Sequence, residues 1–156
     1  MAKALAEGVK APSFTLAVDS GETVALKDFA GKKLVLFFYP KDDTAGCTKE
    51  AIGFTEAAAK FKRAGAVILG VSRDTVAKHQ KFKEKHGLKV ALGADESGKV
   101  TEDYGVWVEK SMYGRKYMGI ERATYLIDEK GVIRTIWRKV KVAGHVDEVV
   151  AAVKAL

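Results

Sequence analysis

Two unbroken apolar runs of strand length constrain the fold most strongly. Residues 33–39 (KLVLFFY) end at Pro40, and residues 66–72 (AVILGVS) repeat the pattern. Runs of this length without polar alternation are typical of strands that are buried on both faces. Each run is followed by a segment that favours a helix, over residues 44–63 and 75–86. This strand, helix, strand, helix order predicts a parallel α/β core.

The ends of these two helices carry their own signals. Gly65 and Gly87 follow the helical segments and are typical stop residues, because glycine adopts the left-handed conformation readily. Asp74 stands just before the second helix, where its carboxylate can cap unpaired backbone N–H groups. We therefore expect one long helix after the first strand and a capped helix after the second.

Three further segments complete the predicted sheet. Residues 124–127 and 132–137 flank the turn sequence DEKG, which favours an antiparallel hairpin and makes the sheet mixed. Residues 14–18 and 23–26 indicate a short N-terminal β-hairpin. Residues 146–155 place valines on one side of a helix, which should cover a face of the sheet. The prediction is a central mixed β-sheet flanked by helices.

The size and composition fit a single domain over residues 1–156. The chain is 47% hydrophobic and 30% charged, and its longest apolar run is far too short to cross a bilayer. Residues 1–16 contain no apolar stretch followed by a small-residue cleavage site, so we expect no signal peptide and a cytoplasmic location. The net charge of +7 is spread over both halves, which favours a solvated lysine-rich surface over nucleic-acid binding.

Cys47 is the only cysteine in the chain, so no intramolecular disulfide can form. A lone cysteine is usually a small buried packing residue. Cys47, however, lies in the first helical turn after a buried strand, at the sheet edge where α/β proteins bind ligands. The N-terminus of a helix favours an anion, and the thiolate is the nucleophilic form of cysteine. The position therefore indicates a reactive thiol.

Three neighbours of Cys47 can support such chemistry. Thr44 lies about one turn earlier, so its hydroxyl can cap the helix or donate to the sulfur. Pro40 can shield one side of the site from water, although it is also a simple strand terminator. Glu50 lies one turn later and is near enough to orient a cation from another strand, or it is only a favourable acid in the first turn.

The pattern Pro40-x-x-x-Thr44-x-x-Cys47 resembles the active-site signature of the peroxiredoxins. The stretch FFYPKDDTAGCTKE is similar to the subfamily of the bacterioferritin comigratory protein, or peroxiredoxin Q. The resemblance extends over nearly the whole chain, through GVKAPSFTL (8–16), LKDFAG (26–31), VSRD (71–74), YGVW (104–107) and ERATYLIDEKG (121–131). It implies a thioredoxin-like fold, with Arg122 joining Pro40, Thr44 and Cys47 in the catalytic positions.

The resemblance also implies a reaction. Cys47 attacks the O–O bond of hydrogen peroxide or an organic hydroperoxide and becomes a sulfenic acid, while Arg122 stabilises the charge on the leaving oxygen. Many subfamily members carry a resolving cysteine at the positions of Ile52 or Lys83. Because this chain has none, we expect glutathione, a glutaredoxin or a thioredoxin to reduce Cys47 in a one-cysteine cycle. A disulfide between two copies of Cys47 is the minor alternative, and we expect a monomer or a weak homodimer.

Two other functions each fit part of the sequence. In a non-enzymatic binding module, the basic residues near Trp137 would contact nucleic acid and Cys47 would be a packing residue. We favour another role for these basic residues, in which their charges protect the exposed edge of the hairpin. A thiol–disulfide oxidoreductase would need a second cysteine. Trp107, Tyr113 and Met118 either form an apolar wall near the site or serve ordinary packing.

No cofactor or metal is expected. Gly31 precedes a strand and lacks the glycine and lysine spacing that cradles nucleotide phosphates. His79, His86 and His145 are dispersed and lack ligand spacing to one another, which favours surface or capping roles over metal binding.

Overall fold

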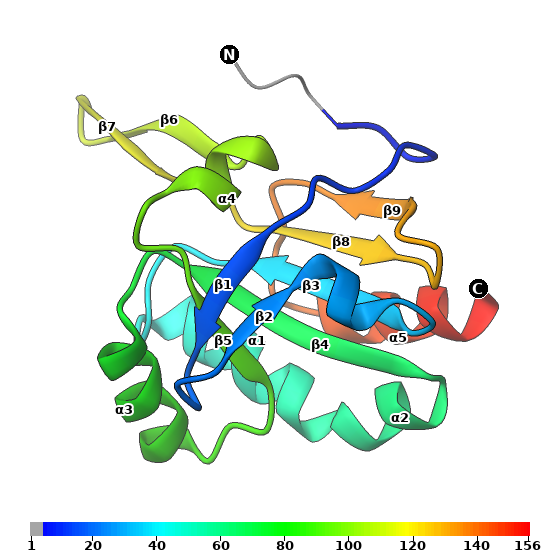
Figure 1. Cartoon of the computed structure of the whole chain (residues 1–156). Helices are drawn as coiled ribbons and strands as arrows, with labels where there is room; N and C mark the ends of the chain where they lie inside the picture. Colours follow the sequence, from blue (N-terminus) through cyan, green and yellow to red (C-terminus); the bar gives the residue numbers. More distant parts are fainter. Residues whose placement is uncertain (1–4) are drawn as a thin grey trace.

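The computed structural model describes residues 5–156. Residues 1–4, the first part of the stretch in which we expect no signal peptide, lie outside the described residues. A seven-stranded sheet runs through the molecule in the order β2-β1-β5-β4-β3-β8-β9 (Figure 1). Its strands are β1 (Thr15–Val18), β2 (Thr23–Ala25), β3 (Lys33–Phe38), β4 (Ala66–Ser72), β5 (Ala91–Ala94), β8 (Ala123–Ile127) and β9 (Ile133–Trp137).

The helices follow the strands in the predicted alternation. They are α1 (Ala45–Glu56), α2 (Ala58–Arg63), α3 (Val76–His86), α4 (Lys99–Asp103) and α5 (His145–Ala155), with a short 3-10 helix, η1 (Leu26–Phe29). Strands β3, β4 and β5 are parallel, whereas β8 runs antiparallel to β3. The predicted mixed sheet and both predicted hairpins, β1 with β2 and β8 with β9, are confirmed.

The side chains of β3 alternate between two core layers, which explains its unbroken apolar sequence. Leu34, Leu36 and Phe38 pack on one face, with the N-terminal segment and α4. Val35 and Phe37 pack on the other face against α1, α2, α3 and α5. Both layers exclude water, so neither face of the strand needs a polar residue.

Two helix boundaries differ from the sequence prediction. The expected single helix over 44–63 breaks at Ala57, whose dihedral angles (φ −91°, ψ 1°) leave the helical range. No glycine or proline marks this break, so the sequence does not signal it. The cap of α3 is Thr75, whose hydroxyl accepts from the backbone N–H of Lys78, and not Asp74. The Asp74 carboxylate is instead occupied by Ser72 and by the backbone N–H of Asp42.

A second, two-stranded sheet projects from the main body (Figure 1). It consists of β6 (Trp107–Met112) and β7 (Arg115–Ile120), joined by a turn in which Tyr113 is 98% exposed. Met118 is half exposed on β7. The apolar wall that the sequence allowed is therefore wrong for Tyr113 and Met118, because the hairpin that carries them leaves the core and faces solvent.

The close packing of β3 on β4 predicts that Gly70 tolerates no side chain. A Cβ atom at Gly70 would lie 2.6 Å from Cζ of Phe37, a ring held by the core. We expect Gly70→Ala to lower the free energy of unfolding by about 1 to 3 kcal/mol in urea titrations. The control is Gly119→Ala, whose Cβ would meet the flexible chain of Lys110 at 3.2 Å and Cε2 of the exposed Tyr117 ring at 3.4 Å. Equal stability of the two variants would contradict the prediction.

Candidate active site

Cys47 lies where β3 passes into α1, at the carboxyl end of the parallel strands. The chain leaves β3 at Phe38, and α1 begins after its N-cap residue Thr44. Cys47 is therefore in the first turn, where backbone N–H groups have no partner within the helix. Its side chain is only 1% exposed. The sulfur is thus held in a protected site with a positive helix end beside it.

The register of the sheet brings Arg122 to this sulfur from a distant part of the chain. Ala123 pairs with Phe38 across the antiparallel β8 and β3, so Arg122 stands beside the end of β3. Its Nη2 lies 3.4 Å from Sγ of Cys47. Gly46 permits this approach, because a Cβ there would lie 3.1 Å from the same Nη2. The structure therefore places a guanidinium directly against the thiol.

Glu50 holds the other side of the guanidinium. Its Oε1 accepts a hydrogen bond from Nη1 of Arg122 at 2.8 Å, and the carboxyl group is fully buried. Burial raises the pKa of Glu50 to about 7, although the charge of Arg122 acts in the opposite direction. Its Oε2 is a buried side-chain oxygen for which residues 5–156 supply no hydrogen-bond partner. The pair therefore combines a fixed cation with a carboxyl group that titrates near neutral pH.

Burial alone lowers the pKa of the Arg122 guanidinium, but Glu50 and Cys47 outweigh this effect and the net direction is upward. The side chain therefore stays charged. Lys110, on β6, is a further basic group near the site, and no motif in the sequence indicates it. Burial, followed by the charge of Arg122, lowers the pKa of Lys110, whereas Cys47 raises it.

Thr44 and Pro40 line the loop that leads into α1. The Thr44 hydroxyl makes no capping bond and donates to the Lys41 carbonyl at 2.9 Å. Pro40 is partly buried directly after Tyr39. The structure thus keeps both residues in the loop before Cys47, and the Thr44 hydroxyl is oriented by the loop rather than by the helix.

Trp107 contacts Arg73, whereas Arg122 contacts Cys47 and Glu50. Its indole ring is stacked under the guanidinium of Arg73, with 3.3 Å between Cζ and the ring centroid. Arg73 is further held by the hydroxyl of Thr101 at 2.9 Å. Trp107 therefore anchors the base of the β6–β7 hairpin to the main sheet, which is the packing role that the sequence left open.

Two of the three histidines are buried, so the expected surface roles are wrong for them. His79, on α3, is fully buried and contacts Asp42 in the loop before α1. His145 begins α5 and bonds the hydroxyl of Thr124 at 2.8 Å. Burial, followed by the charge of Arg122, lowers the pKa of His145 to about 4. Helical spacing could have found His79, which stands three residues before the buried Phe82.

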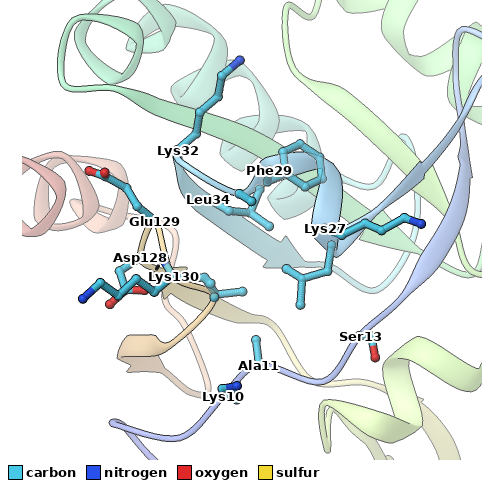
Figure 2. A pocket seen from close by; sticks show the side chains of 14 residues that line it. Lys10, Ala11, Ser13, Lys27, Phe29, Lys32, Leu34, Asp128, Glu129 and Lys130 are labelled. Carbon is cyan, nitrogen blue, oxygen red and sulfur yellow. Dashed lines mark hydrogen bonds between the residues drawn. The ribbon is translucent and has the colours of Figure 1, made fainter.

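Figure 2 shows a pocket of about 330 Å³ that Cys47 does not line. It is lined by Leu34, at the start of β3, and by Asp128, just after β8, whereas Cys47 lies beyond the other ends of these strands. Over residues 5–156, no group of three or more His, Cys, Asp or Glu side chains is placed to hold a metal ion. No helix within that range is long and apolar enough to span a membrane.

Comparison with known sequences finds a family and individual relatives that match most of the chain. The profile of the AhpC/TSA family matches residues 8–136. The chain is 56% identical over 143 residues to a putative peroxiredoxin bcp of Coxiella burnetii, covering 92% of this chain and 95% of the relative. It is 50% identical over 147 residues to peroxiredoxin Bcp of Bacillus subtilis, covering 94% of each.

Solved structures agree with the sequence relatives. The bacterioferritin comigratory protein of Xanthomonas campestris, described for its alkyl peroxide reduction activity, superposes with a TM-score of 0.87 at 44% identity, covering 91% of this chain and 90% of that one. A cysteine-to-serine mutant of PrxQ from Xylella fastidiosa gives a TM-score of 0.93 at 35% identity and 98% coverage of both chains. The thioredoxin-like fold is thereby confirmed.

The burial of Glu50 predicts how stability depends on pH. Its pKa rises from an ordinary 4.5 to about 7 on folding, so the folded protein binds more protons than the unfolded chain between these values. Against the upward slope that His145 contributes between about pH 4 and 6.5, Glu50 should therefore give the free energy of unfolding a downward slope as pH rises through this window. Glu50→Gln should remove this slope, a difference on the order of 1 to 3 kcal/mol between pH 4.5 and 8 in urea titrations. Parallel curves for the two proteins would contradict the prediction.

Proposed function

Because this chain belongs to the AhpC/TSA family and is a thiol-dependent peroxidase of the Bcp peroxiredoxin type, we propose that Cys47 is its nucleophile. The contact that carries the proposal is the 3.4 Å approach of Arg122 Nη2 to Sγ at the start of α1. A guanidinium and a helix N-terminus both favour the thiolate, which is the reactive form of the side chain.

The proposed reaction forms one bond and breaks one. The Cys47 thiolate attacks one oxygen of the peroxide, an S–O bond forms, and the O–O bond breaks. The leaving oxygen takes a proton and departs as water or an alcohol, which leaves Cys47 as a sulfenic acid. Arg122 stabilises the negative charge that passes to the leaving oxygen, and Glu50 fixes the guanidinium in that position.

In this proposal, Thr44 and Pro40 help to position the peroxide beside the sulfur. The Thr44 hydroxyl donates a hydrogen bond to the Lys41 carbonyl, so its oxygen keeps lone pairs that can accept a hydrogen bond from a bound hydroperoxide. Pro40 has no N–H and covers part of the loop, which limits access of water. These contacts support substrate positioning rather than bond breaking.

An external thiol completes the proposed cycle. The chain has no second cysteine, so the sulfenic acid condenses with a thiol from another molecule, releases water and forms a mixed disulfide. A second thiol then releases Cys47. Glutathione, a glutaredoxin or a thioredoxin fits this role. Because Cys47 is 1% exposed, the site must open before so bulky a thiol reaches the sulfur.

The alternative of a basic nucleic-acid module is not favoured. Arg134 pairs with Asp128 at 3.4 Å, and Arg138 pairs with Glu121. These carboxylates neutralise part of the positive charge of the basic residues near Trp137. Cys47 also contacts a guanidinium and is not surrounded only by apolar groups.

The proposed role of Arg122 predicts a slow peroxide step in its absence. Replacing Arg122 by Met should slow oxidation of Cys47 by about 10- to 1000-fold, the loss expected for one donor at a developing anion. Stopped-flow mixing with hydrogen peroxide measures this rate. The control is Arg134→Met, which removes an exposed arginine from β9, and Cys47→Ser sets the inactive baseline. A rate for Arg122→Met within about threefold of the native rate would remove Arg122 from the mechanism.

The one-cysteine cycle predicts distinct oxidation products. Without thiol, one equivalent of peroxide should leave Cys47 as a sulfenic acid, and excess peroxide should drive it to sulfinic and sulfonic acids. With glutathione, a mixed disulfide at Cys47 and continuous peroxide consumption are expected. Mass spectrometry under non-reducing conditions distinguishes these forms. If neither the sulfenic acid nor a Cys47 adduct forms and thiol does not sustain turnover, the cycle is wrong.

A further inference from the structure

A buried polar contact joins the loop before Cys47 to helix α3. Asp42, in that loop, places Oδ2 2.6 Å from Nδ1 of His79. The imidazole is fully buried and the Asp42 side chain is only 5% exposed. Neither residue touches Cys47 or takes part in the reaction described above. The contact nevertheless fixes the loop that carries Pro40 and Thr44.

The geometry of the contact shows how the ring is used. Nε2 of His79 faces the Gly93 carbonyl at 2.9 Å, and Nδ1 faces the Asp42 carboxylate. Each ring nitrogen therefore has a polar partner, and the ring is held at both ends between the loop before α1 and Gly93 on β5. The Tyr39 hydroxyl donates to the other oxygen of Asp42, and burial followed by the charge of Asp42 raises the pKa of Tyr39. Every polar atom of the contact is thus occupied.

Other contacts of the loop are weaker or more exposed. The backbone N–H of Asp42 donates to Asp74 Oδ2 at 2.8 Å, next to the end of β4. Asp43 pairs with Lys85 at 2.8 Å and with His86 at 2.9 Å, on a more open surface. Exposed pairs contribute little to stability, whereas removing one partner of a buried pair leaves the other unsatisfied. The Asp42–His79 contact therefore dominates the docking of the loop on α3.

We propose that His79 is a positioning residue that acts on Cys47 through Asp42. The contact holds residues 40–44 in the arrangement that receives peroxide, and it also opposes the opening that an external thiol needs to reach the buried sulfenic acid. The contact therefore favours the reaction with peroxide and opposes the reaction with the external thiol. This inference rests on the proposed role of Cys47, and it concerns the balance between the two steps rather than the chemistry of either.

Measuring the two steps separately tests the proposal. Breaking the contact by His79→Gln should slow peroxide oxidation of Cys47 by about tenfold, since small displacements of a reacting group are costly, and should speed the reaction of the sulfenic acid with glutathione by about threefold or more. Asp42→Asn, which preserves the side-chain shape, should shift both rates in the same directions. The double variant should add little to either single change, because both remove one contact.

The matched control is His86→Gln, the same substitution on the same helix at the more exposed pair with Asp43. It should change neither rate by more than about twofold. Circular dichroism of each variant shows whether it is folded, and if His79→Gln unfolds, Asp42→Asn carries the test. Rates that fall together, or that stay native in both variants, overturn the proposal. A native protein without thiol-dependent turnover would instead refute the proposed function.

Discussion

The pairing of β3 with β4 on one side and β8 on the other is the constraint on which the site depends. It fixes the end of β3, where the loop to Cys47 begins, and the start of β8, where Arg122 stands. Residues 75 positions apart thereby meet at 3.4 Å. Because the two faces of β3 pack into different core layers, a one-residue shift of register would move each side chain into the wrong layer and separate the sulfur from its cation.

The charges around Cys47 are arranged at the cost of burying a carboxyl group. Glu50 orients Arg122 but is fully buried, and burial raises its pKa to about 7. His145, at the start of α5, is close enough to feel the charge of Arg122, and its pKa is lowered to about 4, so it adds no charge at neutral pH. The guanidinium is therefore the dominant charge in contact with the sulfur, and its partner can gain or lose a proton near the working pH. Such a pair serves reactivity more than stability.

The sequence predicted the elements whose signals are local. The apolar runs and the turn sequences located β3, β4 and the two hairpins, and the motif around Cys47 drew attention to Thr44, Pro40 and Glu50. The break at Ala57 carried no residue signal. The burial of His79 and the exposure of Tyr113 depend on which elements pack together, and the pattern of the chain does not encode this locally. Arg122 came from family resemblance, because its approach to Cys47 follows from strand register.

The single buried thiol has a kinetic consequence. In the proposed cycle, peroxide and reductant react in turn at the same sulfur, so the protein alternates between two covalent states and follows a substituted-enzyme scheme. At low thiol concentration the oxidised state accumulates, and further peroxide then adds oxygen to the sulfur instead of being removed. The capacity of the protein is thus set by the supply of the second molecule, and its oxidation state reports the ratio of oxidant to thiol around it.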